Sequence, residues 1–396
     1  MANILFAWER GGGYGHILHH LALLRELKKR GHKILFAVKN MVSAGQYLDP
    51  ASIPYVQAPH PGFRAPEAQR IKPLNNLPQM LFNIGYHDPA SMVERLRAWR
   101  LLFDSFKPKI LVADFAPTAL LAAKGTGIST LVIGAGILLP PKGDPVPSMR
   151  FWSRIDPQPL RKDESRLLEA MNRAGAVVGI PSSFDVSDLI YGDTNWLRTI
   201  PELDAYSPRD NVPYYPFLNK GAMGVIPKWP EGNGRRIFGY IKPSPKIFSL
   251  VRALKNTGCS VLLYAPAIGE EVRKQLASDR LHFSPQPLRM DCVVRECDFA
   301  VLQSTFGTVQ DMLIGGKPML LLAENIDQLV TAHKVMAAGT GLIWSRLENN
   351  LKLTDCLERL LREPDWSAKA AALGSDLRQR TFDTSAELLA DIIERL

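Results

Sequence analysis

Residues 4–31 read ILFAWERGGGYGHILHHLALLRELKKRG, and this stretch decides the fold class. A short apolar run from Ile4 to Trp8 predicts a buried strand, and the glycine-rich segment Gly11 to Gly15 predicts a loop after it. A helix is expected from Ile17 to Arg30, because apolar residues recur there at helical spacing: Leu18, Leu21, Leu24 and Leu27. Gly31 ends it, where a left-handed residue is often needed. A strand, loop and helix in this order are typical of an α/β protein with a parallel sheet.

The same alternation recurs along the chain in two series. Further strands of the first series are expected at 34–38, 110–113 and 131–133, and those of the second at 236–241, 261–264, 299–302 and 319–322. Helical patterns separate the strands, as parallel sheets require. We therefore predict an α/β protein with two Rossmann-like, doubly wound parallel-sheet domains that face each other across a cleft.

The chain has 396 residues, which is long for one core and fits two domains of similar size. Prolines crowd the weakly periodic sequence between the two series, and such a stretch is typical of a linker. The expected bounds are 1–205 for the N-terminal domain, 206–234 for the linker and 235–375 for the C-terminal domain. A C-terminal helix within 376–396 is expected to pack back on the N-terminal domain.

The composition narrows the range of partners and locations. The formal charge is +9, from 48 Lys and Arg against 39 Asp and Glu, but the basic residues are scattered. Solvated faces and an anionic small ligand account for them, so no nucleic acid partner is expected. No stretch reaches the roughly 18 apolar residues that a membrane span needs, and any membrane contact is expected to be peripheral.

Four cysteines without a paired spacing predict reduced, buried thiols: Cys259, Cys292, Cys297 and Cys356. The N-terminal sequence lacks a basic region before its short apolar run, so it predicts a strand instead of a signal peptide. Together these features favour a cytoplasmic protein.

His16 and Asp114 are the first candidates for chemistry. His16 lies where the glycine loop meets the first helix, and Asp114 directly follows the strand predicted at 110–113. Ligands bind outside the carboxyl ends of parallel strands, so both side chains are expected at one sheet edge. There His16 would act as a general base, with the helix dipole favouring its neutral form, and Asp114 would orient it. Helix capping by either residue is the alternative.

Two further interpretations concern the same segment. The loop Gly12, Gly13, Tyr14 and Gly15 offers backbone amides to an acceptor or phosphate, or forms only a tight structural turn. His16, His19 and His20 have the helical spacing of a transition-metal site, but no third ligand or H-E-x-x-H pattern accompanies them, so no metal is expected.

The second candidate constellation lies between Ser284 and Leu342. It comprises Gln286 in the segment 285–288, the run Gln303 to Asp311 after the strand expected at 299–302, the segment Gly315 to Met319, and Asp327 with Gln328. Hydroxyl and amide groups at a helix N-terminus suit a pyrophosphate, and paired acid and amide side chains suit a polyol.

These motifs resemble the nucleotide-sugar glycosyltransferases of family 1, the UDP-glycosyltransferase superfamily of the GT-B fold. The donor motif of that family reads approximately His-Gly-Gly-Phe-Gly-Thr-x-x-Glu, then Gly-x-Pro, then Asp-Gln. The resemblance also includes the N-terminal Gly-His, a later Arg30-Gly31-His32 and the strand end at Asp114, so it spans nearly the whole chain.

The resemblance implies a role for each matching residue. His16 would be the catalytic base with Asp114 as its partner, the N-terminal domain would bind the acceptor, and the C-terminal domain would bind the nucleotide sugar. The implied donor-binding residues are Lys242, Ser244, Gln286, Gln303, Ser304, Thr305, Phe306, Gly307, Thr308, Asp311, Asp327 and Gln328. For Lys242 and Ser244 a solvated loop is an equal alternative.

The chain also departs from the family pattern. Gln303-Ser304-Thr305 replaces the His-Gly-Gly triplet, and Asp311 replaces the usual glutamate. No D-x-D triplet is present to hold Mg²⁺ on a pyrophosphate, so helix dipoles and hydrogen-bond donors are expected to stabilise the leaving group.

The resulting hypothesis is a metal-independent, inverting glycosyltransferase with no cofactor. It would move a sugar from a nucleotide-diphosphate donor, UDP- or dTDP-linked, to a hydroxyl of a small-molecule or lipid acceptor. A catalytically inactive nucleotide-sugar-binding relative and a nucleotide-sugar epimerase remain alternatives. Gly134 to Pro141 and the aromatics Phe151 and Trp152 either line an apolar acceptor pocket or only pack their loops.

Overall fold

The protein is described by a computed structural model of residues 1–396. The model describes every residue except 13–14, 61, 63, 181–184, 217–223, 233, 243–246, 267, 346, 349–351 and 381–383, and at Ser43 it describes the backbone alone. The chain divides into two compact units. The first comprises Met1–Phe217 with Asp383–Leu396, and the second comprises Leu218–Phe382.

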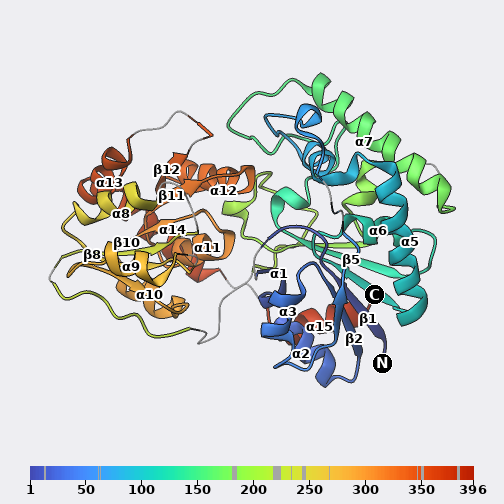
Figure 1. Ribbon diagram of the computed structural model, residues 1–396, viewed down its shortest axis with the longest axis horizontal. Coiled ribbons are helices and arrows are strands. Elements are labelled where there is room, and N and C mark those ends of the chain that lie inside the picture. Colours follow the sequence, from blue (N-terminus) through green and yellow to red (C-terminus); the bar gives the residue numbers. More distant parts are fainter. Residues whose placement is uncertain are drawn as a thin grey trace. The chain divides into compact units, whose positions relative to one another are not determined.

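The first unit contains a parallel sheet of six strands (Figure 1). The strands are β1 (Asn3–Ala7), β2 (Lys33–Val38), β3 (Tyr55–Gln57), β4 (Ile110–Ala113), β5 (Ser129–Gly134) and β6 (Thr194–Leu197). Their order is β3-β2-β1-β4-β5-β6, and Leu5 of β1 pairs with Leu35 of β2 and Leu111 of β4. The direction of winding reverses between β1 and β4, which is where a doubly wound sheet binds ligands.

Helices and short helical turns connect these strands. They are α1 (Gly15–Leu18), α2 (Leu21–Lys29), α3 (Met41–Leu48), α4 (Leu77–Leu81), a π-helical turn (Phe82–Tyr86), α5 (Pro89–Phe106), α6 (Pro117–Ala123), α7 (Pro157–Val177), and 3₁₀ turns at Glu67–Gln69, Gly136–Leu138, Val186–Leu189 and Pro201–Leu203. The apolar stripe of α2 is buried, and it packs with Ile4, Phe6 and Trp8 in one core. Periodicity therefore predicted this packing correctly.

The prediction of one helix from Ile17 to Arg30 is wrong. The backbone turns at His19 and His20, between α1 and α2. The His20 amide donates to the carbonyl of Ile17, three residues back, at 3.0 Å, and this tightened turn interrupts the regular ladder. As a result α1 has only four residues, so its dipole offers little positive charge to His16.

The second unit repeats the same topology. Its strands are β7 (Arg236–Tyr240), β8 (Ser260–Tyr264), β9 (Leu281–Ser284), β10 (Phe299–Leu302), β11 (Met319–Ala323) and β12 (Gly341–Ser345). They lie in the parallel order β12-β11-β10-β7-β8-β9, with the reversal between β7 and β10. The helices are α8 (Ile247–Lys255), α9 (Glu270–Leu276), α10 (Met290–Glu296), α11 (Phe306–Ile314), α12 (Ile326–Ala337), α13 (Leu353–Arg362) and α14 (Pro364–Gln379). Two doubly wound parallel sheets were predicted, and the structure confirms them.

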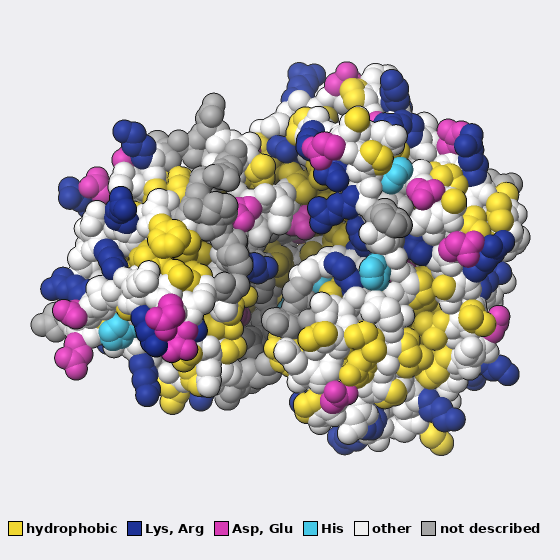
Figure 2. All heavy atoms as spheres, viewed as in Figure 1, with side chains coloured by type: hydrophobic (Ala, Val, Ile, Leu, Met, Phe, Trp, Pro, Cys, Tyr) yellow, Lys and Arg dark blue, Asp and Glu magenta, His cyan; other side chains and the backbone are white. Residues whose placement is uncertain are grey.

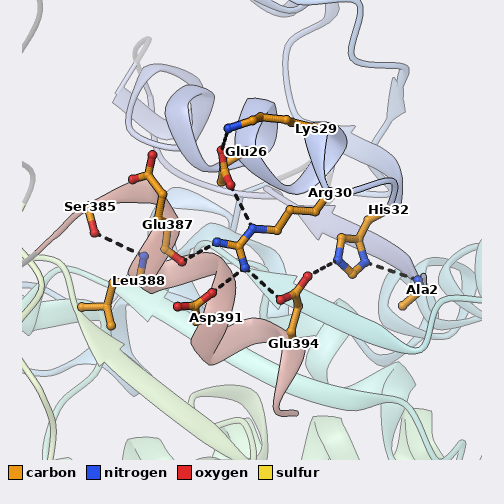
Figure 3. Close-up of polar contacts among 10 residues, drawn as sticks. All are labelled: Ala2, Glu26, Lys29, Arg30, His32, Ser385, Glu387, Leu388, Asp391 and Glu394. Carbon is orange, nitrogen blue, oxygen red and sulfur yellow. Dashed lines mark hydrogen bonds and ion pairs between the residues drawn. The ribbon is translucent and has the colours of Figure 1, made fainter.

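The last helix, α15 (Ala386–Glu394), belongs to the first unit and packs beside α2. Its buried residues Leu389 and Ile393 join the core of that unit. Figure 3 shows the polar contacts at this junction: the Arg30 guanidinium lies between carboxylates of α2 and α15 and donates to Asp391 at 2.5 Å and to Glu394 at 2.8 Å. The preceding α14 lies in the second unit, so the expected boundary at 376 falls inside a helix.

Much of the expected linker is packed structure within the two units. Arg209 donates to both carboxylate oxygens of Asp204 at 2.7 Å, and neither side chain is exposed by more than 3%. The same guanidinium donates to the carbonyls of Gly136 and Leu139, so it fixes the loop after β5. The described residues up to 216 belong to the first unit, and Arg209 makes these contacts within it.

The surface and the cysteines add three observations. On the face drawn in Figure 2, Lys and Arg side chains are spread over both units among acidic and apolar side chains. None of the described helices has the length and apolar character that crossing a bilayer requires. The four cysteines are buried and have free thiols.

Candidate functional site

His16 and Asp114 meet at the switch point of the first sheet. Asp114 directly follows β4, and His16 follows β1 on the one-turn helix α1. The Nδ1 atom of His16 lies 3.0 Å from Oδ1 of Asp114. A carboxylate accepts hydrogen bonds only, so Nδ1 carries a proton, and the lone pair of the neutral imidazole is then on Nε2. The structure thus brings together the two residues that the sequence predicted as a pair.

The other oxygen of Asp114 binds a second histidine that the sequence analysis did not assign to this role. His20 Nε2 lies 2.9 Å from Asp114 Oδ2, and His20 is fully buried. On the far side of the ring, Arg198 Nη2 donates to His20 Nδ1 at 3.3 Å. An arginine has no acceptor, so His20 must be protonated on Nε2 and must donate to Asp114.

Electrostatics agree with this assignment of protons. Burial, followed by the charge of Arg198, lowers the pKa of His20 to about 4, so this ring is neutral at pH 7. Burial raises the pKa of Asp114, but the hydrogen bonds from His16 and His20, with the charge these rings carry when protonated, hold it far below its usual range. Asp114 is therefore a fixed negative charge that accepts from two imidazoles.

Neighbouring residues fix the ring of His16. Trp8 stacks on it with ring centroids 5.1 Å apart and planes inclined by 15°. Gly11 has φ +88°, and a Cβ on it would collide with His16 Nε2, so only glycine fits there. Phe115 adopts φ +50°, a conformation that non-glycine residues rarely take, and this turns the chain sharply after Asp114.

A second buried acid, Glu9, holds the start of α6 next to the same sheet edge. Glu9 follows Trp8 and accepts from the amides of Thr118 and Ala119 at the start of α6, at 3.2 and 2.6 Å. The hydroxyl of Tyr86 also donates to Glu9, at 2.8 Å. Burial raises the pKa of Glu9, and its hydrogen bonds partly offset that effect. Glu9 anchors α6, and with it the turn that carries Asp114.

The remaining N-terminal predictions have mixed outcomes. Gly12 lies in the loop before α1, where a Cβ would meet open space, and Gly15 is the first residue of α1. Gly13 and Tyr14 lie outside the described residues. His16 and His20 direct ring nitrogens at one carboxylate. Within the described part of the chain, no group of three or more His, Cys, Asp or Glu is placed to hold a metal ion.

In the second unit, Gln303 occupies the switch point between β7 and β10. Its Oε1 accepts from the amide of Lys242, and its Nε2 donates to Glu324, each at 2.9 Å. The side-chain amide thus ties the loops after β7, β10 and β11 together. Ser304, also buried, donates to the carbonyl of Leu322 at 3.4 Å. Glu324 was not assigned from the sequence.

Thr305 precedes α11, and its buried hydroxyl has no hydrogen-bond partner among the described residues. An unsatisfied buried hydroxyl costs about 1–3 kcal/mol, so its position at a helix N-terminus indicates a ligand oxygen. Phe306, Gly307 and Thr308 form the first turn of the same helix, and their amides face the same end.

The other predicted donor residues lie on the loops and helices around this edge. Gln286 is exposed after β9, and Asp311 lies in the second turn of α11. Asp327 is exposed in the first turn of α12, whereas Oε1 of the Gln328 side chain accepts from the backbone amide of Glu324 at 2.8 Å. Burial lowers the pKa of Lys242. Ser244 lies outside the described residues.

An apolar pocket opens beside Asp114 in the first unit. Its lining includes Ala113, Phe115, Leu120, Gly134 and Leu138, with Leu189 and Ile190 from a later turn. Gly134 and Leu138 belong to the segment in which an acceptor pocket was expected. Phe151 and Trp152 instead pack edge to face on each other, with ring centroids 5.1 Å apart.

Comparisons with known proteins agree with this architecture. No family model matches the chain. It is similar to zeaxanthin glucosyltransferase of Pseudescherichia vulneris, at 22% identity with 88% of each chain covered. Among solved structures, spinosyn rhamnosyltransferase SpnG matches with a TM-score of 0.69 at 17% identity over 100% of both chains. Glycosyltransferase VinC in complex with dTDP matches with a TM-score of 0.65 at 16% identity, also over 100% of both chains.

The fold is that of the GT-B glycosyltransferases. In this GT-B fold, the His16 and Asp114 pair lies at the switch point of the first sheet, and the Thr305 hydroxyl lies at the corresponding point of the second.

Proposed function

We propose that the protein is a metal-independent, inverting glycosyltransferase that moves a sugar from a nucleotide-diphosphate donor to an acceptor hydroxyl. The observation that carries the proposal is the anchored imidazole of His16. Its Nδ1 is held by Asp114, so Nε2 is available to take a proton at the ligand-binding edge of the sheet. The proposed reaction needs no cofactor besides the nucleotide sugar.

In this mechanism His16 Nε2 removes the proton of the acceptor hydroxyl as its oxygen attacks the anomeric carbon. The bond to the diphosphate breaks on the opposite face, and the configuration inverts. Asp114 stabilises the imidazolium that forms, while His20 and Arg198 hold Asp114 in place.

The second unit is proposed to bind the donor. The N-terminus of α11 and the unpaired hydroxyl of Thr305 suit the diphosphate, which leaves with negative charge. Lys242, Gln286, Asp311, Asp327 and Gln328 are proposed to contact the rest of the donor. Because SpnG has also been solved with thymidine diphosphate, a dTDP-sugar is a suitable first donor, with UDP-sugars tested beside it.

The acceptor is proposed to be a small molecule with an apolar body. The apolar residues that line the small pocket beside Asp114 would contact that body, with the reacting hydroxyl toward His16. SpnG has been solved with the spinosyn aglycone, a precedent for an aglycone acceptor on this fold.

The test is a transfer assay with pooled dTDP- and UDP-sugars and a set of hydroxylated acceptors. His16→Ala is expected to lower turnover about 10²–10⁴-fold with nucleotide affinity unchanged, because general-base catalysis is worth that much. The matched control is His282→Ala, which alters an exposed histidine of the second unit. Turnover of His16→Ala equal to wild type would refute the role of His16.

The same assay distinguishes the alternatives. An inactive relative would bind nucleotide and give no glycosylated product. An epimerase would convert the donor sugar without any acceptor, which analysis of the recovered sugar would detect.

A further inference from the structure

Three basic residues follow three adjacent strands of the first sheet. Arg10 comes after β1, Lys39 directly follows β2, and Arg64 lies on the segment after β3. These strands are neighbours in the order β3-β2-β1, so their carboxyl ends lie along one part of the sheet edge. The topology thus gathers cations that are 25 or more residues apart in the sequence.

Each of these side chains is held differently. Arg10 is only 9% exposed, and its Nη2 donates to the carbonyl of Ile84 at 2.8 Å. The ammonium of Lys39 donates to the carbonyl of Gly11, and Arg64 is exposed. The cluster therefore runs from a nearly buried guanidinium to an exposed one.

The electrostatics of the cluster favour an anion. Burial and then the charges of Arg10 and Arg64 lower the pKa of Lys39, and among the described residues the charges that act on it are both positive. Of the two acids at this edge, Glu9 accepts from the start of α6 and partly offsets the charge of Arg10, and Asp114 accepts from two histidines. Like charges held close together cost free energy, which a bound anion would relieve.

The cluster lies beside the proposed base. Lys39 donates a hydrogen bond to the carbonyl of Gly11, and a Cβ placed on Gly11 would collide with His16 Nε2. Gly11 thus separates Lys39 from His16 Nε2, the atom that would deprotonate an acceptor, so a ligand on Lys39 would lie close to that atom. The short helix α1 cannot supply this positive charge, so side chains take that role.

We propose that Arg10, Lys39 and Arg64 bind an anionic group, carboxylate or phosphate, carried by the acceptor. The proposal rests on the proposed function and adds the substrate class: a hydroxylated acceptor that also bears an acid. The acid group sits on the cluster and the hydroxyl sits at His16 Nε2, so the cluster selects the acceptor and positions it.

The experiment compares acceptors in charged and neutral pairs: 4-hydroxybenzoate with its methyl ester, and 4-hydroxyphenyl phosphate with hydroquinone. For each pair, KM in the transfer assay and Kd from direct titration are measured with wild type and with Lys39→Met and Arg64→Met. Wild type is expected to prefer the charged member at least tenfold. Lys39→Met should reduce that preference by about 10–100-fold and exposed Arg64→Met by a few-fold, since charge-assisted hydrogen bonds are worth that much.

Lys33→Met is the matched control, because Lys33 lies at the opposite end of the same strand β2 and is exposed. It should keep the wild-type preference. The Arg64→Met variant is expected to fold normally, since an exposed side chain can be removed with little effect on stability, so it tests the cluster even if Lys39→Met does not fold. Equal use of charged and neutral acceptors by wild type, or an unchanged preference in both cluster variants, overturns the proposal.

Two further outcomes show whether the anion belongs to the donor or the acceptor, and whether the anion site or the proposed function itself is wrong. If Lys39→Met weakens binding of dTDP or UDP and leaves the acceptor preference unchanged, the cluster binds the donor and the proposal is wrong. If wild type transfers no sugar, the proposed function fails, and the titrations with the paired compounds still decide whether the cluster binds an anion.

Discussion

Replacing Asp114 with asparagine would remove the carboxylate between His16 and His20 and, through the changed hydrogen bonds, alter the tautomer of His16. Arg198 fixes His20 as a donor toward position 114, so the asparagine must turn its carbonyl to His20. Its NH₂ group then faces His16 Nδ1, which lies 3.0 Å from the present oxygen. To accept that bond, His16 must carry its proton on Nε2, where it can no longer act as a base.

The expected loss follows from this geometry. A carboxylate 3.0 Å from the imidazolium contributes about 5.5 kcal/mol at an effective dielectric constant of about 20. At about 1.4 kcal/mol per tenfold change, this is a factor of about 10⁴ in kcat. It agrees with the upper part of the range for general-base catalysis.

The assay is kcat for sugar transfer, with donor affinity measured in parallel by titration. Donor affinity should stay unchanged, because the donor is proposed to bind the second unit. Asp104→Asn, an exposed residue of α5, is the matched control and should behave as wild type. A kcat of Asp114→Asn within about fivefold of wild type would show that the proton arrangement is incorrect or that His16 is not the base.

Four further predictions concern stability and donor binding. Because the pKa of His20 is lowered from 6.5 to about 4, the folded state binds fewer protons there than the unfolded state. The free energy of unfolding should therefore fall by about 3 kcal/mol as pH drops from 6.5 to 4, and urea titrations should show a smaller loss for His20→Gln. Thr305→Val should leave the melting temperature nearly unchanged but weaken binding of dTDP or UDP about tenfold, and an unchanged Kd would remove that hydroxyl from the donor site. Arg209→Met leaves the Asp204 carboxylate buried without its guanidinium and should cost about 3–5 kcal/mol, whereas a loss below about 1 kcal/mol would contradict a structural role for the pair. Ile393→Ala opens a cavity where α15 meets the core and should cost about 2–4 kcal/mol in chemical denaturation, with no change expected for exposed Leu101→Ala.

Local sequence patterns predicted most of the strands that carry the site. The strand at 110–113 has the same bounds in the structure, and so does the strand at 299–302. These segments are continuous apolar runs buried on both faces, which is why their pattern is clear. The strands β3, β6, β9 and β12 were not predicted. Of these, β3, β6 and β9 have only three or four residues, some of them at least partly exposed, and so give too weak a pattern.

The break between α1 and α2 was missed for a different reason. The segment contains no glycine or proline at the break, and its leucines keep helical spacing through it. The backbone turns where His20 is fully buried and bonded to Asp114, a residue 94 positions away. A tertiary contact of this kind leaves no local signal.

The sequence by itself determined the class of the fold, the edge of each sheet at which ligands bind, and the pairing of His16 with Asp114. These follow from residues next to one another in the chain, because a polar residue directly after a buried strand must lie at the strand's carboxyl end. Only the tertiary structure decided which ring nitrogens of the site carry protons and which charged side chains lie near one another. Arg198 reaches His20 across 178 residues, and Lys39 meets Arg10 and Arg64 because β1, β2 and β3 are neighbours in the sheet. Charges act through space over a few ångströms, so the effect of one charged residue on another depends on which strands are neighbours in the sheet. The number of residues between the two in the sequence does not matter.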